Sequence, residues 1–196
     1  MKMKIVSIVL AIAGIFTLDS NAQTSSDGFG IAAGALSLKS WEGMSEGPAS
    51  LEGRQLTYAT LGLSYKKRFW DIGAGGLFGG RAYNESVITT PQSGYGCYKQ
   101  PAKTSTFFVE APGYGWYGET GLTYRLGHFY AGGQGQLTSL WMQSGANNET
   151  LEKRWWINAS AGPKVGLEFG RFALEGSYQW GSKANLFAFL FNVKLR

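Results

Sequence analysis

Long segments of this chain alternate apolar and polar side chains residue by residue, and no other feature constrains its fold as strongly. The pattern is clearest near the C-terminus, where the apolar positions are Phe187, Phe189, Phe191, Val193 and Leu195. Successive side chains of a β-strand point to opposite faces, so this alternation indicates strands whose two faces meet different surroundings. Helical periodicity is absent after residue 22. The sequence therefore predicts an all-β fold.

Eight alternating segments follow one another, at about 28–38, 55–66, 69–83, 116–125, 128–141, 155–169, 172–180 and 186–196. Most of them have the ~9–11 residues that a tilted strand needs to cross the hydrocarbon layer of a membrane. Short turns alternate with long connections, and the long ones are expected at 39–54, 84–115, 142–154 and 181–185. We therefore expect an eight-stranded antiparallel up-and-down transmembrane β-barrel with short periplasmic turns and long outer loops.

The first 22 residues have the pattern of a signal peptide. Lys2 and Lys4 precede an apolar run over 5–18 that is too short to span a bilayer, and small residues at 20–22 supply a cleavage site. This makes residues 23–196 the expected mature barrel domain. No window of 18 consecutive apolar residues follows, and charged residues are only 16% of the chain against a usual ~25%. A closed barrel is then the remaining way to span a membrane.

Each of the three short turns, at 65–70, 124–129 and 169–172, joins aromatic residues through basic ones. Tyr and Trp suit the headgroup level of a membrane because they combine an apolar ring with a polar group. Basic side chains at this rim can contact anionic phospholipid headgroups, and they are Lys66, Lys67, Arg68, Arg125, Arg171, Lys194 and Arg196. We expect this rim to face the periplasm, with outer-membrane lipids as neighbours; solvated charged turns are the alternative.

The inward-facing positions are expected to carry charges of both signs. The acidic ones are Asp71, Glu119, Glu168 and Glu175, and the basic ones are Arg81, Lys164, Lys194 and Arg196. The lumen of an eight-stranded barrel is just wide enough for side chains, so these groups are expected to pair into a plug that leaves no aqueous pore. The interior is expected to be polar throughout.

The sequence shows no residue set for catalysis, metal binding or cofactor binding. His128 is the only histidine, and it falls in a short turn, which gives neither a histidine-cluster metal site nor a catalytic triad. The glycine-rich segment 73–80 lies inside an alternating segment rather than before a helix, so it does not predict a phosphate loop. The formal net charge of +5 is mild, and nucleic acid is not an expected partner.

The longest connection, 84–115, shows no clear regular structure in its sequence, and long loops of this kind are often functional. Its aromatic residues and the neighbouring tryptophan are candidate contacts for lipopolysaccharide, a glycan or an envelope or surface protein: Tyr95, Tyr98, Phe107, Phe108, Tyr114 and Trp116. A loop that packs on itself and caps the lumen is an equal alternative. Cys97, the single cysteine, either links two chains or is an idle thiol.

The leader, the eight amphipathic segments, the three short turns and the aromatic ladder of the last strand together resemble the small OmpA/OmpX-like outer-membrane barrels. The resemblance covers residues 23–196 and is architectural. It implies a Gram-negative outer membrane and folding by the barrel-assembly machinery, although the chain ends Val193-Lys194-Leu195-Arg196 where such barrels often end in an aromatic residue. The family includes adhesion, envelope-stabilising and lipid-modifying members, so it selects no activity.

The first hypothesis is therefore a non-enzymatic integral outer-membrane protein whose loops contact the envelope or the cell surface. A lipid-modifying enzyme is the second, with Ser93, Tyr95, Glu110 or Glu119 as candidate residues. A narrow channel for small or hydrophobic solutes is the third. A secreted soluble ligand-binding barrel is the fourth, and it requires outward-facing positions to be polar, which the phenylalanines at 187–191 oppose.

Overall fold

A computed structural model describes residues 27–40, 42–46, 48–90, 103–111, 113–147 and 149–195 of the 196-residue chain. The expected signal peptide, Tyr95, Tyr98, Cys97 and Arg196 lie outside these ranges. Every regular element in the described residues is a β-strand.

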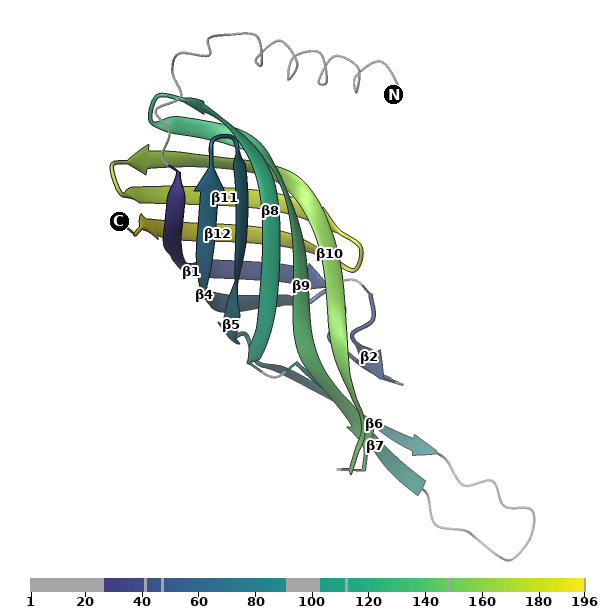
Figure 1. The fold of residues 1–196 in the computed structure, drawn as a ribbon. Coiled ribbons are helices and arrows are strands. Elements are labelled where there is room, and N and C mark those ends of the chain that lie inside the picture. The colour runs from purple at the N-terminus through teal and green to yellow at the C-terminus, as the bar shows by residue number, and fades with distance from the viewer. Residues whose placement is uncertain are drawn as a thin grey trace, which may run out of the picture.

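Eight strands form a closed antiparallel barrel (Figure 1). They are β1 (Gly28–Ser40), β4 (Gln55–Lys67), β5 (Trp70–Gly79), β8 (Tyr114–Leu126), β9 (Phe129–Ala146), β10 (Glu149–Phe169), β11 (Phe172–Gly181) and β12 (Ala184–Lys194). Each pairs with the next in this order, and β12 pairs with β1 to complete the ring. The predicted eight-stranded up-and-down barrel is confirmed.

Left-handed backbone conformations close the three short turns at one end of the barrel. Arg68, Gly127 and Gly170 have φ angles of 54°, 62° and 61°. Glycine adopts this conformation without the steric penalty that a Cβ brings, which explains two of the three residues. Arg68 is held there in part because its backbone N–H donates to Asp27 Oδ1, 2.6 Å away. The turns lie where the aromatic and basic pattern predicted them.

The opposite end differs from the prediction. The prediction of a long connection at 142–154 is wrong, because β9 and β10 stay paired from the barrel wall up to Ala146 and Glu149. The connection at 84–115 contains a second hairpin, formed by β6 (Ala82–Thr90) and β7 (Lys103–Ala111). Strand β7 pairs with β9 over Phe107–Glu110, so β6, β7, β9 and β10 form a sheet that projects beyond the barrel (Figure 1).

A small hairpin lies at this same end, between β1 and β4. It consists of β2 (Ser45–Glu46) and β3 (Ala49–Ser50). Gly43 and Gly53 flank it with φ angles of 76° and 75°, which lets the chain reverse sharply on both sides. The segment 42–54 that contains this hairpin is called the cap segment below.

Candidate functional site: the apolar outer wall and the sealed interior

The outward face of the barrel is apolar on all eight strands. Each strand carries large hydrophobic side chains that are between 39% and 61% exposed, among them Phe29, Leu63, Ile72, Leu122, Leu137, Val165, Leu174 and Phe189. Inward-facing residues of the same strands are buried, so exposure alternates with period two. Contiguous apolar patches of this extent are rare on monomeric soluble proteins. A soluble barrel would instead carry polar side chains on its outward face.

Aromatic side chains gather toward both ends of this wall. Near the short turns, Phe29 lies against Tyr65 with ring centroids 4.8 Å apart, and Phe172 stacks on Phe191 at 5.7 Å. Toward the other end, Trp141 and Trp155 form an edge-to-face pair at 5.0 Å. Aromatic pairs near both ends are typical of the two girdles of a transmembrane barrel, and β12 carries two further exposed aromatic residues, Phe187 and Phe189, between them.

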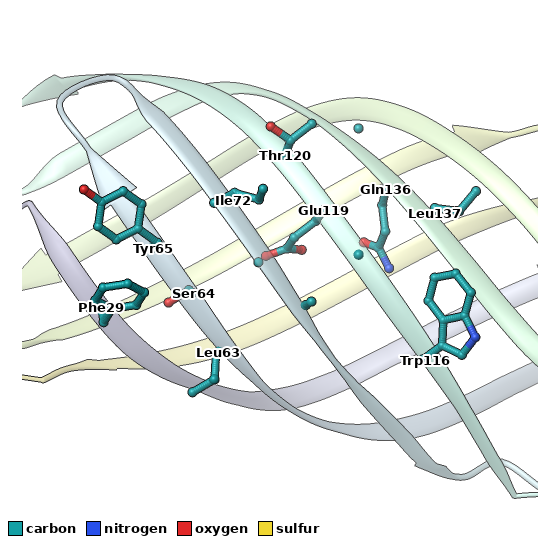
Figure 2. Close-up of a pocket in the computed structure, with 14 residues that line it drawn as sticks. Phe29, Leu63, Ser64, Tyr65, Ile72, Trp116, Glu119, Thr120, Gln136 and Leu137 are labelled. Atoms are coloured by element: carbon teal, nitrogen blue, oxygen red, sulfur yellow. The ribbon is translucent and has the colours of Figure 1, made fainter.

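The outer wall is hollowed over β4, β5, β8 and β9 (Figure 2). One cross-strand row of outward-facing residues there runs Leu63, Ala74, Gly118 and Leu137, so its two middle positions carry almost no side chain. Figure 2 shows Phe29 and Tyr65 at one end of the groove and Trp116 at the other. The volume of the groove is about 620 Å³.

The interior at the short-turn end holds a network of buried ion pairs. Lys164 Nζ lies 2.8 Å from Asp71 Oδ2 and 2.7 Å from Glu175 Oε2, and its side chain is 3% exposed. Lys66 also pairs with Glu175. These contacts join β4, β5, β10 and β11 across the lumen.

A second group of charges surrounds Glu168. Its carboxylate lies 2.7 Å from Arg125 Nη1 and also pairs with Lys194. The structure thus brings Asp71, Lys164, Glu168, Glu175 and Lys194 into interior ion pairs. Lys66 and Arg125, placed at the rim by the sequence analysis, turn inward instead, because they share the parity of Ser64 and Thr123.

Two other predicted interior charges behave differently. Glu119 faces inward and accepts a 2.6 Å hydrogen bond from Gln134 Nε2. The prediction for Arg81 is wrong: its side chain is 76% exposed and pairs at 2.8 Å with Glu110 of β7, because the barrel part of β5 ends at Gly79.

Next to Glu119, a layer of neutral polar groups crosses the middle of the lumen. Gln179 Nε2 donates to Gln136 Oε1 at 3.1 Å, and Ser160 Oγ donates to Gln179 Oε1 at 2.7 Å. The sequence alone does not predict this layer, because it depends on the register of three strands, β9, β10 and β11. Every side chain in it is buried.

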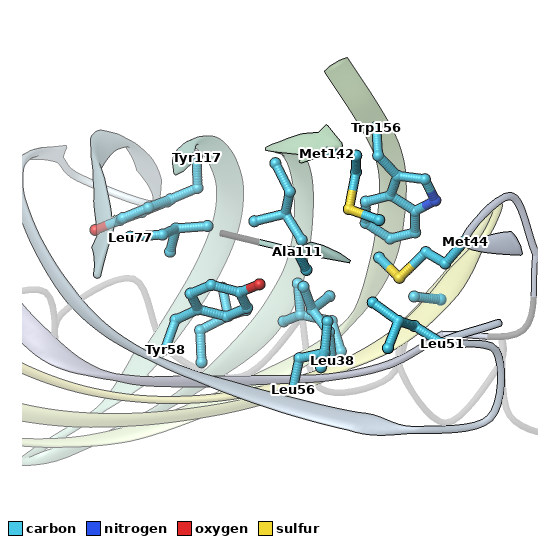
Figure 3. Close-up of a cluster of buried hydrophobic side chains, with 14 of the residues drawn as sticks. Leu38, Met44, Leu51, Leu56, Tyr58, Leu77, Ala111, Tyr117, Met142 and Trp156 are labelled. Carbon is cyan, nitrogen blue, oxygen red and sulfur yellow. The ribbon is translucent and has the colours of Figure 1, made fainter. Parts of the chain in front are cut away.

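The other half of the interior is apolar, so the prediction of a polar lumen throughout is wrong. Inward-facing side chains of the barrel strands pack there into one buried cluster that includes Leu36, Leu38, Leu56, Tyr58, Leu77, Leu140, Met142, Trp156 and Leu186 (Figure 3). Met44 and Leu51 of the cap segment and Val109 and Ala111 of β7 complete it. The cap segment and β7 therefore close this end of the barrel with hydrophobic side chains.

Hydrogen bonds fix the cap segment to β9 and β10. Trp156 Nε1 donates to Glu42 O at 3.0 Å, and Arg154 Nη2 donates to Gly43 O at 3.2 Å. Ser144 Oγ donates to Glu46 Oε2 at 3.3 Å. The long connection that caps the lumen is thus 42–54 together with part of 84–115.

The aromatic residues predicted as partner contacts do not form one cluster in the described part of the chain. Phe107 packs against the buried apolar cluster, and Phe108 stacks on Tyr83 with centroids 6.0 Å apart. Tyr114 and Trp116 point outward from β8 and are 51% and 41% exposed.

The candidate residues for lipid chemistry are also not brought together. Glu110 is bound by Arg81, Glu119 faces the lumen, and Ser93 and Tyr95 lie outside the described residues. His128 sits in its turn, with Nδ1 2.9 Å from Glu168 O and its ring stacked on Phe169. Among the described residues, no group of three or more His, Cys, Asp or Glu side chains could hold a metal ion. Within the same ranges, no helix has the length and apolarity to cross a bilayer.

An eight-stranded antiparallel ring with an apolar outer wall and a filled interior has the architecture and the outward polarity of small transmembrane β-barrels. Neither a protein-family model nor a curated protein sequence matches the chain. A solved structure that does match is the crystal structure of Ail, the attachment invasion locus protein of Yersinia pestis, in complex with the heparin analogue sucrose octasulfate. The two are 11% identical with a TM-score of 0.38, over 86% of this chain and 97% of that one.

Proposed function

We propose that this protein is a non-enzymatic integral outer-membrane β-barrel whose interior is closed to solutes and whose projecting sheet makes contacts outside the membrane. The observation that carries this proposal is the continuous apolar outer wall, since large hydrophobic side chains are exposed on every barrel strand. In water such a wall would drive aggregation, whereas in lipid it needs no partner.

The proposed orientation places the short turns in the periplasm and the projecting sheet outside the cell. Exposed basic residues lie at the short-turn rim, either in the turns or pointing outward: Lys67, Arg68 and Arg171. Their charges suit anionic phospholipid headgroups. The projecting sheet β6–β7–β9–β10 carries hydrogen-bonding groups such as Asn84, Glu85 and Glu110, as expected of a part in water.

Membrane integration is tested by fractionation of cells that express the full chain. We expect the protein in the outer-membrane fraction after a carbonate wash, and we expect its gel mobility to differ between unboiled and boiled samples. Recovery as a soluble periplasmic protein with a single mobility would contradict the proposal.

Orientation is tested with Cys97, the single cysteine of the chain, which lies in the sequence that joins β6 to β7. A membrane-impermeant maleimide should label it on intact cells, and the Cys97→Ser variant should take up no label. Labelling only after the outer membrane is permeabilised would reverse the orientation.

The closed interior is tested by conductance in planar bilayers. Ion pairs fill the lumen near the short turns and apolar side chains fill the other half, so the folded protein should give no single-channel steps. Reproducible conductance steps from heat-modifiable protein would favour the narrow channel instead.

A protein or glycan partner is proposed for the projecting sheet, and its lipid surroundings include lipopolysaccharide in this orientation. The exposed residues that support this are Tyr83, Val87 and Ile88 of β6. Binding of intact cells to host or envelope fractions, compared with cells expressing a variant that lacks residues 84–110, tests it directly. Equal binding by both would refute the assignment to this sheet.

A further inference from the structure

We propose that the groove in the outer wall is a binding site for one anionic phospholipid of the periplasmic leaflet, with an acyl chain along the groove and the headgroup at Lys67 and Arg68. This inference rests on the proposed membrane location and orientation. It adds a particular ligand and a particular site to them.

The groove has the size and chemistry of a ligand site. Its volume of about 620 Å³ falls within the ~300–1,000 Å³ of ordinary ligand pockets. Ala74, Gly118 and Gly135 line the groove and add little side-chain bulk. The hydrophobic side chains of Leu63 and Leu137 lie on either side (Figure 2). A flexible hydrocarbon chain can fill such a hollow, because unfilled space there would forfeit van der Waals contacts with the wall.

The end of the groove nearest the short turns is where a lipid headgroup would lie. Tyr65 and Ile72 form that end and are paired across β4 and β5. Lys67 is two residues beyond Tyr65 on the same face, about 7 Å nearer the turn. Trp70 lies opposite Lys67 and donates from Nε1 to Thr120 Oγ1 at 2.9 Å, which positions its ring at the groove mouth.

The charges favour a lipid over a second copy of this chain. Two copies that packed through this face would bring the basic turns of both, Lys67 and Arg68, toward each other, and like charges at an interface are unfavourable. An anionic headgroup meets the same two side chains favourably. In a bilayer the acyl chain gains nothing from leaving water, so the headgroup contact and the fit of the groove decide the selectivity.

The glycines of the wall offer a matched pair of variants. A Cβ added at Gly118 meets no atom within 4 Å, so we expect Gly118→Leu to extend into the groove without a clash at its Cβ. A Cβ at Gly176 also meets nothing within 4 Å, and Gly176 faces outward on β11, away from the groove. Gly176→Leu is therefore the control for adding a leucine to the outer wall.

The experiment is native mass spectrometry of the folded full mature chain in a neutral detergent, titrated with phosphatidylglycerol or with phosphatidylcholine. We expect a one-to-one phosphatidylglycerol adduct with the wild type and Gly176→Leu, and its loss with Gly118→Leu. Lys67→Gln should weaken the adduct about fivefold. Lys153→Gln, which removes an exposed charge from β10 at the opposite end of the barrel, should leave it unchanged.

Several results would overturn the inference. An adduct that survives Gly118→Leu would show that the lipid does not bind in the groove. An adduct that forms equally with phosphatidylcholine would show that the site does not select an anionic headgroup. A wild-type dimer that Gly118→Leu converts to monomer, without a lipid adduct, assigns the groove to a second copy. Wild-type protein that shows no heat-modifiable mobility refutes the proposed membrane barrel itself, which separates that failure from failure of the groove.

Discussion

Replacing Lys164 with methionine tests whether the interior ion pairs hold the barrel together. Lys164 lies between Asp71 and Glu175 at 2.8 and 2.7 Å and is 3% exposed, so its removal leaves buried carboxylate charge. Glu175 keeps Lys66 as a partner, whereas Asp71 loses its lysine. Removing one member of a buried pair typically costs about 3–5 kcal/mol, and we expect Lys164→Met to lower the free energy of unfolding by about this amount.

The assay is equilibrium unfolding by urea in lipid vesicles, followed by tryptophan fluorescence and by heat-modifiable mobility. The double variant Asp71→Asn with Lys164→Met removes the unpaired charge as well, so it should recover roughly half or more of the lost stability. Lys67→Met, at an exposed lysine of the same rim, should stay within about 0.5 kcal/mol of the wild type. A loss below about 1 kcal/mol for Lys164→Met, or no recovery in the double variant, would refute the reasoning.

Three further variants test other parts of the barrel. Trp156→Ala removes the largest side chain of the apolar cluster and should cost about 3–5 kcal/mol in the same urea assay; a loss under about 1 kcal/mol would contradict the packed cap. Gly132→Val places a Cβ 1.9 Å from Leu122 O and should abolish the heat-modifiable form, whereas Gly133→Val has no atom within 4 Å of its Cβ and should fold. Leu61→Arg puts a charge midway along the outward face of β4 and should cost about 2–4 kcal/mol in vesicles; an unchanged stability would argue that this face is not in lipid.

Strand number, turn positions and the apolar outer wall could be predicted from the sequence because they depend only on local periodicity. The C-terminal alternation from Phe187 to Leu195 identifies the outward face of this strand without any knowledge of its neighbours. The three short turns follow in the same way, from basic and glycine residues between aromatic ones.

The outer end could not be predicted, because its structure depends on contacts between distant segments. Val109 of β7 and Met44 of the cap segment are buried only because both segments fold over the same barrel mouth. The continuation of β9 and β10 past Trp141 and Trp155 was missed because polar residues at 143–154 look like a loop when no partner strand is known. Arg81 was misplaced for a related reason, since the parity of β5 was carried past its end at Gly79.

The inward rotation of Lys66 and Arg125 could have been found from the sequence. Both continue the inward parity of their strands, set by Ser64 and Thr123, whereas Lys67 continues the outward one. Their partners Glu175 and Glu168 lie on other strands, and only the order of strands around the ring brings them together.

The pairing of β12 with β1 is the contact that closes this barrel. Every other pair in the ring joins barrel strands that follow one another along the chain. The pair of β1 and β12 joins the first and last strands that the structure describes, from Gly30 with Lys194 to Ser40 with Ala184. Until residues 184–194 pair with it, β1 keeps a bare edge of backbone donors and acceptors, which hydrocarbon does not tolerate. The ion pair of Lys194 with Glu168 also waits for that strand. The ring is therefore sealed only when its first and last strands have paired, however many of the other strands are already in place.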